Sequence, residues 1–163
     1  MEPFDRYRDG WKKPLCIKLP SDNCRHGYGL CLQQLTRETR CVYCGLDLTR
    51  DYHSWLLLCR DHVVPTRVAR GLGIQEDFLA DPINQVVACS GCNGFKNRWG
   101  GKRLPPGFED VKPHTPWTLG EFVKLRDRVF EARSKAIGER RENEKATFAE
   151  KRWLKEYGCP ARS

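Results

Sequence analysis

The chain has 163 residues, enough for one modest hydrophobic core with appendages but too few for two independent cores. Lysine and arginine number 29 against 21 aspartates and glutamates, and the formal charge of +8 favours a polyanionic partner, above all nucleic acid. Charge alone does not decide this, because many basic domains bind nothing specific. The longest apolar run, residues 55–59, is far too short for a bilayer, which needs about 20 residues, so no membrane association is expected.

The nine cysteines could indicate a secreted disulfide scaffold, but that class needs a signal peptide and a chain with too little core to fold unaided. Five of residues 1–9 are charged, and no apolar segment follows them. The sequence therefore predicts a cytoplasmic protein in a reducing compartment, with thiols that are free or bound to metal.

Taken in chain order, residues 1–38 carry turn signals and a few aromatic residues, which predicts a loosely structured lead-in with a short helix near residues 30–37. Residues 39–101 are predicted to form the central unit. The expected elements are a strand within 54–64, some helix over 75–79 in a long connection, a second strand over 86–89, and a helix over 93–98 that ends at Gly100-Gly101.

The carboxy-terminal third is predicted to be a proline-containing linker, residues 102–117, followed by a helical region, residues 118–163. Thr118 and Glu121 match a capping box, and Gly138 is expected to break or weaken the helix that starts there. The apolar stripe could pack back onto the core, the favoured reading, or form a dimer surface. It consists of Phe122, Leu125, Val129 and Phe130.

Basic residues of this helical region alternate with glutamates, a pattern that favours a solvated, salt-bridged face over a dedicated DNA-binding surface. The basic residues concerned are Arg126, Arg133, Arg140, Arg141, Lys145, Lys151 and Arg152.

Two Cys-x-x-Cys pairs, Cys41/Cys44 and Cys89/Cys92, form the strongest motif. Each pair places two thiolates on one tight turn, and two such turns complete the tetrahedron of a structural zinc site whose fourth position is closed to substrate. A redox Cys-x-x-Cys usually stands alone, so that alternative does not explain the second pair.

The segment between the cysteine pairs contains Asp61-His62-Val63-Val64-Pro65. A strand places adjacent side chains on opposite faces, so one of Asp61 and His62 can bind a metal ion while the other addresses a water. An isolated Asp-His pair is more often a hydrogen-bonded structural pair. Its position between two metal-binding turns, with Asn84 and Asn93 nearby in sequence, favours a catalytic role.

Residues 41–98 resemble the HNH endonucleases of the beta-beta-alpha-metal type. The resemblance rests on Cys-x-x-Cys at 41–44, Asp-His-x-x-Pro at 61–65, Asn84, and Cys-x-x-Cys-Asn-x-x-Lys at 89–96. It implies that His62 is the general base, that Asn84 orients it, and that Asp61 and Asn93 bind the catalytic divalent ion. The chain would then be an H-N-N variant.

An amide oxygen at Asn93, in place of an imidazole, favours magnesium or manganese over softer ions. Lys96 falls one helical turn after Asn93 and could contact a phosphate, although a solvated helix lysine is an equal alternative. Asp61→Ala is expected to spare the fold and to remove divalent-dependent activity alone.

The expected fold is therefore α+β, a small zinc-stapled strand-strand-helix nuclease core with helical flanks. The expected activity is hydrolysis of phosphodiester bonds in DNA, with RNA as another candidate substrate, and a monomer is favoured. The alternative is a zinc-containing module that binds nucleic acid without cutting it.

Overall fold

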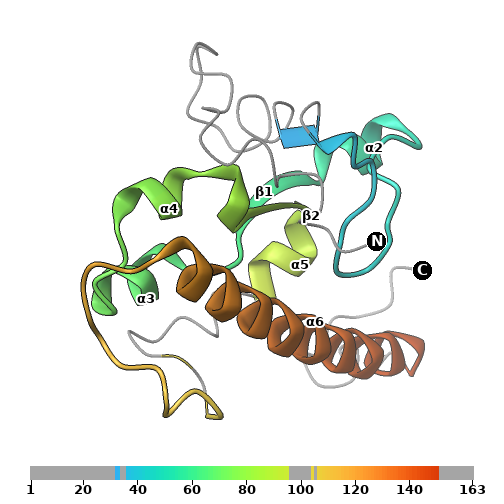
Figure 1. The fold of residues 1–163 in the computed structure, drawn as a ribbon. Coiled ribbons are helices and arrows are strands. Elements are labelled where there is room, and N and C mark those ends of the chain that lie inside the picture. Colours follow the sequence, from blue (N-terminus) through green and yellow to red (C-terminus); the bar gives the residue numbers. More distant parts are fainter. Residues whose placement is uncertain (1–31, 34–35, 96–103, 105, 151–163) are drawn as a thin grey trace, which may run out of the picture.

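The structure is a computed structural model, and it describes residues 32–33, 36–95, 104 and 106–150 (Figure 1). It has the expected mixed α+β architecture, built on a two-stranded antiparallel sheet and one long helix. In order the elements are α2 (Tyr52–Leu56), β1 (Leu58–His62), α3 (Thr66–Gly71), α4 (Glu76–Ala80), the 3-10 helix η3 (Pro82–Asn84), β2 (Gln85–Cys89), α5 (Ser90–Phe95) and α6 (Leu119–Ala149).

The two strands pair from Leu58 opposite Cys89 to His62 opposite Gln85. Every residue of β2 is buried, so this strand lies at the centre of the fold. The predicted strand over 54–64 begins too early. Asp51 accepts a hydrogen bond from the backbone N–H of Ser54 (2.7 Å) and starts α2 there, which delays the strand to Leu58.

The connection between the strands contains α3, α4 and η3, of which the sequence indicated the helix around 75–79. Between α3 and α4 the chain turns at Gly73, whose φ is +76°. A Cβ atom at this position would lie 2.7 Å from the backbone oxygen of His114, so the close approach of the two segments requires glycine.

The segment before α6 is packed against the fold, unlike the extended linker expected for residues 102–117. Phe108 and Trp117 are buried, and the Trp117 indole N–H donates to the carbonyl oxygen of Leu72 (3.0 Å). The backbone N–H of His114 donates to the same oxygen (3.1 Å), and the ring of His114 stacks on Trp117. The segment is thereby held on the end of α3.

Helix α6 begins at the predicted capping box, in which Thr118 and Glu121 bond each other's backbone N–H groups. The predicted break at Gly138 is wrong, because α6 runs without interruption to Ala149. A single glycine inside a helix costs about 1 kcal/mol relative to alanine. Packing of the residues before Gly138, including the buried Ile137, offsets a cost of that size.

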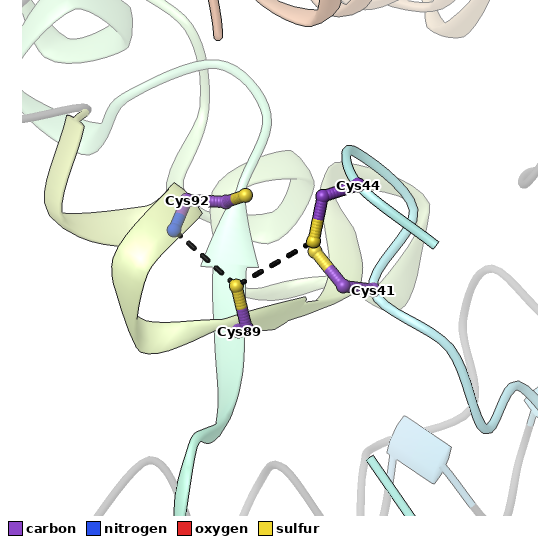
Figure 2. Close-up of side chains that lie close together, drawn as sticks. All are labelled: Cys41, Cys44, Cys89 and Cys92. Carbon is purple, nitrogen blue, oxygen red and sulfur yellow. Dashed lines mark hydrogen bonds between the residues drawn. The ribbon is translucent and has the colours of Figure 1, made fainter. Parts of the chain in front are cut away.

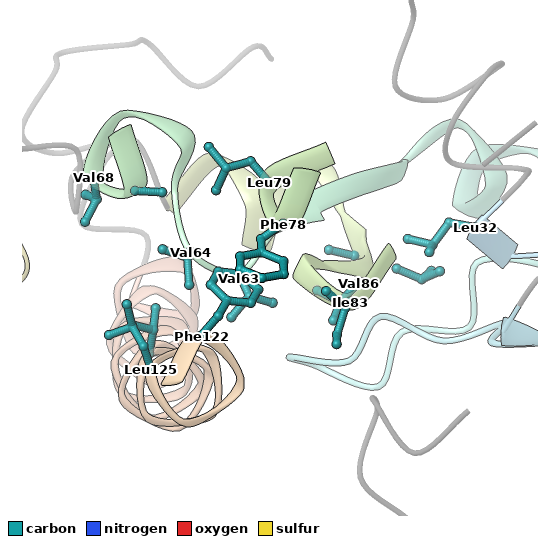
Figure 3. Close-up of a cluster of buried hydrophobic side chains, with 14 of the residues drawn as sticks. Leu32, Val63, Val64, Val68, Phe78, Leu79, Ile83, Val86, Phe122 and Leu125 are labelled. Atoms are coloured by element: carbon teal, nitrogen blue, oxygen red, sulfur yellow. The ribbon is translucent and has the colours of Figure 1, made fainter. Parts of the chain in front are cut away.

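The apolar stripe of α6 packs on the core of its own chain, as favoured from the sequence. Phe122, Leu125 and Val129 are buried, and the ring of Phe122 stacks on that of Phe78 of α4 with 5.1 Å between centroids (Figure 3). Val63 and Val64, which follow β1, lie in the same cluster. Helix α6 therefore covers the end of β1, where the Asp-His pair lies.

Within the described ranges, none of the helices combines the length and the apolar composition needed to cross a membrane.

Candidate functional site

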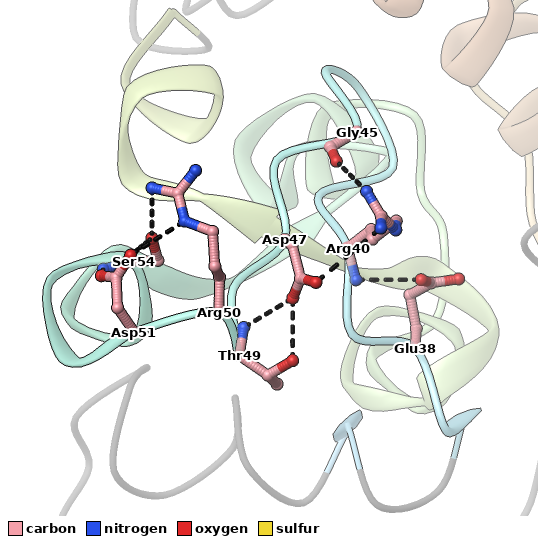
Figure 4. Close-up of polar contacts among 8 residues, drawn as sticks. All are labelled: Glu38, Arg40, Gly45, Asp47, Thr49, Arg50, Asp51 and Ser54. Carbon is pink, nitrogen blue, oxygen red and sulfur yellow. Dashed lines mark hydrogen bonds and ion pairs between the residues drawn. The ribbon is translucent and has the colours of Figure 1, made fainter.

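The first cysteine turn is closed by backbone hydrogen bonds. The N–H of Gly45 donates to the carbonyl oxygen of Cys41 (2.8 Å), the N–H of Cys41 donates to that of Leu46 (2.9 Å), and Gly45 has a φ of +70°. Arg40 reinforces the turn from outside through the carbonyl oxygen of Gly45 (3.1 Å) and the carboxylate of Asp47 (Figure 4). This geometry directs the Cys41 and Cys44 thiols to one side of the turn.

The second cysteine turn joins β2 to α5. Cys89 ends the strand and Cys92 lies in the first turn of the helix, where its backbone N–H donates to the Cys89 sulfur (3.4 Å). The helix thus begins at Ser90, earlier than the expected residue 93. The N–H of Val42 donates to the carbonyl oxygen of Val87 (3.1 Å), and this bond fastens the first turn to the strand that carries the second.

The four cysteines converge into one cluster, with their sulfur atoms all within 4.8 Å of one another (Figure 2). All four are free thiols, and Cys41, Cys89 and Cys92 are buried. Four thiolate donors on two turns are the set that a structural zinc ion takes. The residues therefore fit zinc, as the spacing predicted.

The electrostatics of the cluster are compatible with a bound cation. Hydrogen bonds from Cys41 and Cys92 lower the pKa of the Cys89 thiol, whereas the bond to Cys89 raises the pKa of Cys41. One thiolate therefore forms at the expense of its neighbours, and a bound cation would favour the ionisation of all four. Arg141 of α6 donates to the Cys92 sulfur (3.6 Å), which places positive charge beside the thiolates.

Asp61 lies on the inner face of β1 and is fully buried. Its Oδ2 accepts hydrogen bonds from the Tyr43 hydroxyl (2.7 Å) and from Nη2 of Arg133 (2.6 Å), and Arg133 is itself 1% exposed. Nη1 of Arg133 donates to the carbonyl oxygens of His62 (3.0 Å) and Val63 (2.8 Å). One guanidinium of α6 thus holds the end of β1 through three acceptors.

This arrangement does not by itself build a divalent-ion site at Asp61. Its carboxylate is already neutralised by a guanidinium, and Asn93 on α5 would be the second ligand. Among the described histidine, cysteine, aspartate and glutamate side chains, the four cysteines are the group placed to hold a metal. Asp61 and Asn93 as ligands of a catalytic ion remain predictions.

The contacts of Asp61 also oppose the expectation that Asp61→Ala spares the fold. Removing the carboxylate would leave the guanidinium of Arg133 buried without a counter-charge, which is a strongly destabilising change.

Asn84 is fully buried at the end of η3 and ties down the residues after His62. Its side-chain oxygen accepts from the N–H of Val64 (2.9 Å), and its side-chain nitrogen donates to the carbonyl oxygen of Val64 (3.1 Å). The backbone oxygen of Asn84 accepts from the N–H of Val63 (2.8 Å). These bonds hold the backbone of Val63 and Val64 in place directly after His62.

His62 is half-buried at the end of β1 and lines an open hollow of about 250 Å³. The other lining residues are Arg60, Thr66, Glu76, Leu79 and Ala80. Asp61 points into the core instead, so the pair is divided between two faces as the strand alternation predicted. Lys96, the expected phosphate contact, lies outside the described residues.

Sequence reasoning missed the role of Arg133 and misplaced it, with Arg126, on a solvated face. A usable signal was present, because both arginines follow apolar stripe residues at helical spacing, Arg126 four after Phe122 and Arg133 four after Val129. The solvated face does exist further along α6, where Arg140 pairs with Glu144.

Comparisons with protein-family models, with curated proteins and with solved structures found no match to this chain.

Proposed function

We propose that this protein is a nuclease that hydrolyses phosphodiester bonds in DNA, with His62 as its general base. The observation that carries the proposal is the placement of His62 at an open hollow, on a hairpin fastened to a cysteine cluster and a helix. The same order of elements and motifs underlies the resemblance to the HNH endonucleases of the beta-beta-alpha-metal type.

The chemistry asked of His62 is ordinary for an imidazole. Hydrolysis needs a water that loses a proton as it attacks phosphorus, and an imidazole with a pKa near 6.5 can accept that proton at neutral pH. The backbone of the residues next to it is fixed by Arg133 and Asn84, so the ring is carried on a rigid strand end. The zinc ion would hold the scaffold and stay closed to substrate.

The resemblance also implies a catalytic magnesium or manganese ion at Asp61 and Asn93, and we include that ion in the proposal as a property to be tested. Asp61 is paired with Arg133, and the proton transfer from water to His62 is assigned without using the ion. Proton transfer to an imidazole needs no ion of its own.

A second function has an observation in its favour. An aspartate that is buried and compensated by an arginine needs no metal ion, which suits a zinc-containing module that binds nucleic acid without cutting it. The two functions differ in what they require of His62, since a binding module does not depend on a base.

The deciding experiment incubates zinc-loaded protein with supercoiled plasmid, with and without magnesium, beside His62→Ala and the control His53→Ala. His53 is an exposed histidine on α2. We expect His62→Ala to lower cleavage by about 100- to 10,000-fold, while zinc content, melting temperature and DNA affinity stay near the parent values. His53→Ala should cleave normally.

Equal cleavage by His62→Ala and the parent would show that His62 is not the base. A parent protein that holds zinc and binds DNA but leaves the plasmid intact would favour the binding module.

A further inference from the structure

The hollow beside His62 contains a second basic side chain on the same strand. β1 alternates its side chains, so Arg60 and His62 share one face, and both line the hollow. Thr66, at the start of α3, adds a hydroxyl, and α4 closes the other side with Leu79 and Ala80. At about 250 Å³ the hollow holds several times the roughly 30 Å³ that one water occupies in the liquid.

The charges around the hollow favour an anion. Among the described residues that line it, Glu76 is the acidic one, and its carboxylate is bound by the guanidinium of Arg70. The hydrogen bond from Arg70 holds the pKa of Glu76 below its ordinary range, so this carboxylate is ionised and already compensated. Among the described lining residues, the guanidinium of Arg60 and the imidazole of His62 are then the basic groups that an anion in the hollow would meet.

We propose that Arg60 is the phosphate-binding residue of this site, holding a non-bridging oxygen of the phosphodiester whose attacking water His62 activates. A guanidinium presents paired N–H donors that match two phosphate oxygens, and it stays charged at all physiological pH values. Arg60 lies two residues from His62 on one strand face, so a phosphate on Arg60 lies next to the imidazole. The Thr66 hydroxyl can donate to one of the same two oxygens.

This inference rests on the proposed function, but its site can be tested without catalysis. The probe is dimethyl phosphate, the smallest phosphodiester, titrated into zinc-loaded full-length protein while NMR follows the ring carbon–hydrogen signals of His62 and the guanidinium signals of Arg60. The proteins compared are the parent, Arg60→Met, Arg60→Lys and Arg67→Met. Arg67 is an exposed arginine adjacent to Thr66 and does not line the hollow, so it controls for the loss of one positive charge nearby.

We expect dimethyl phosphate to shift both sets of signals in the parent and the His62 signals in Arg67→Met. The His62 shift should vanish in Arg60→Met and return in part in Arg60→Lys, which restores the charge without the paired donors. A His62 shift in Arg60→Met equal to that of the parent would overturn the assignment, as would a parent protein that shows no shift. The Arg60 signals of the parent give this answer even if Arg60→Met does not fold.

Plasmid nicking by the same proteins separates the two proposals. We expect Arg60→Met to nick about 100-fold more slowly than the parent, the effect of removing one donor from a transition-state oxygen, and Arg67→Met to stay within a few-fold. Dimethyl phosphate binding through Arg60 without any nicking by the parent would defeat the proposed function and leave the anion site standing. Nicking that is unaffected in Arg60→Met would defeat the role of Arg60 and leave the nuclease standing.

Discussion

Arg133 and Asp61 form an ion pair in which both side chains are almost completely removed from water. Removing two charges from water is costly, and the pair is tolerated because further hydrogen bonds satisfy it, from Tyr43 to the carboxylate and from Arg133 to two backbone carbonyls. The pair therefore fixes the position of the strand end more than it adds net stability.

Arg133→Met is expected to lower the free energy of unfolding by about 3–5 kcal/mol, because it leaves the Asp61 carboxylate buried without a cation. Urea denaturation at saturating zinc measures the change. Arg128→Met removes an arginine whose pair with Asp110 is exposed, and should cost about 1 kcal/mol or less.

The double variant Asp61→Asn/Arg133→Met removes both charges and should recover a large part of the loss. If Arg133→Met is as stable as Arg128→Met, the ion pair does not carry the charge balance assigned to it.

Asp81 differs from the described carboxylates whose pKa is lowered by hydrogen bonds, such as Asp51 and Glu76. Burial raises the pKa of its side chain to about 6, against an ordinary value near 3.9, although it accepts a hydrogen bond from the N–H of Ile83 (2.8 Å). Between about pH 4 and pH 6 the folded protein therefore holds a proton on Asp81 that the unfolded chain has already lost. The contribution of this group to the free energy of unfolding falls across that window and is lost once the pH has risen through 6.

Asp81→Asn removes the titration and keeps a side-chain acceptor for Ile83. Its melting temperature should approach that of the parent at pH 4 and exceed it by a growing margin as the pH rises through 6, with a plateau above about pH 7. Other carboxylates titrate in both proteins and cancel in the difference. A difference that stays constant from pH 4 to pH 8 would show that Asp81 ionises normally.

At the level of elements, local sequence signals predicted best where local interactions decide the structure. The capping box at Thr118, the cysteine turns and the strand over 86–89 are each set by neighbouring residues, and the structure has all three. The predicted break at Gly138 is absent because tertiary packing outweighs the intrinsic cost of one glycine in a helix. The predicted start of the first strand was wrong because the sequence analysis did not recognise Asp51 as the N-cap of α2.

The site was predictable in part for the same reason. The spacing of the cysteines determines the cluster, and strand alternation determines which way His62 and Asp61 point. Arg133, the partner of Asp61, lies 72 residues further along the chain, and no local sequence pattern predicts a contact over that separation.

The cysteine cluster gives a testable prediction about α5, the helix that it joins to the sheet. Cys92→Ser removes one of four zinc ligands, so we expect a zinc content well below one ion per chain and a lower melting temperature, since binding of a structural zinc ion contributes directly to folding. Cys59→Ser is the matched control, because Cys59 lies on β1 outside the cluster. Elemental analysis and thermal melting measure both variants. A Cys92→Ser protein that melts with the parent would argue against a structural zinc.

At the scale of the whole molecule, α6 binds three separate parts of the fold with three arginines. Arg126 donates to the carbonyl oxygen of Ile83, next to Asn84, Arg133 holds the end of β1, and Arg141 reaches the Cys92 sulfur. One uninterrupted helix thus spans from η3, which precedes β2, to the cysteine cluster (Figure 1).

The burial of the α6 stripe bears on assembly. Phe122, Leu125 and Val129 are covered by the chain's own core and cannot serve as a dimer surface, so we expect a monomer. Under the proposed nuclease function, one His62 per molecule then gives one strand cut per encounter. Dilute protein should convert supercoiled plasmid to open circles before any linear form appears. Linear product appearing first, together with a dimeric mass in solution, would contradict this.

The long reach of α6 also sets an order of events during synthesis. The cysteine turns and both strands are complete once residue 92 has been made, whereas the counter-charge of Asp61 is contributed by residue 133. Because the chain grows from its amino terminus, zinc can load while the Asp61 carboxylate is still hydrated. We therefore expect a nascent chain to pass through a stage that is metal-bound but still open at β1, and to close there when α6 docks.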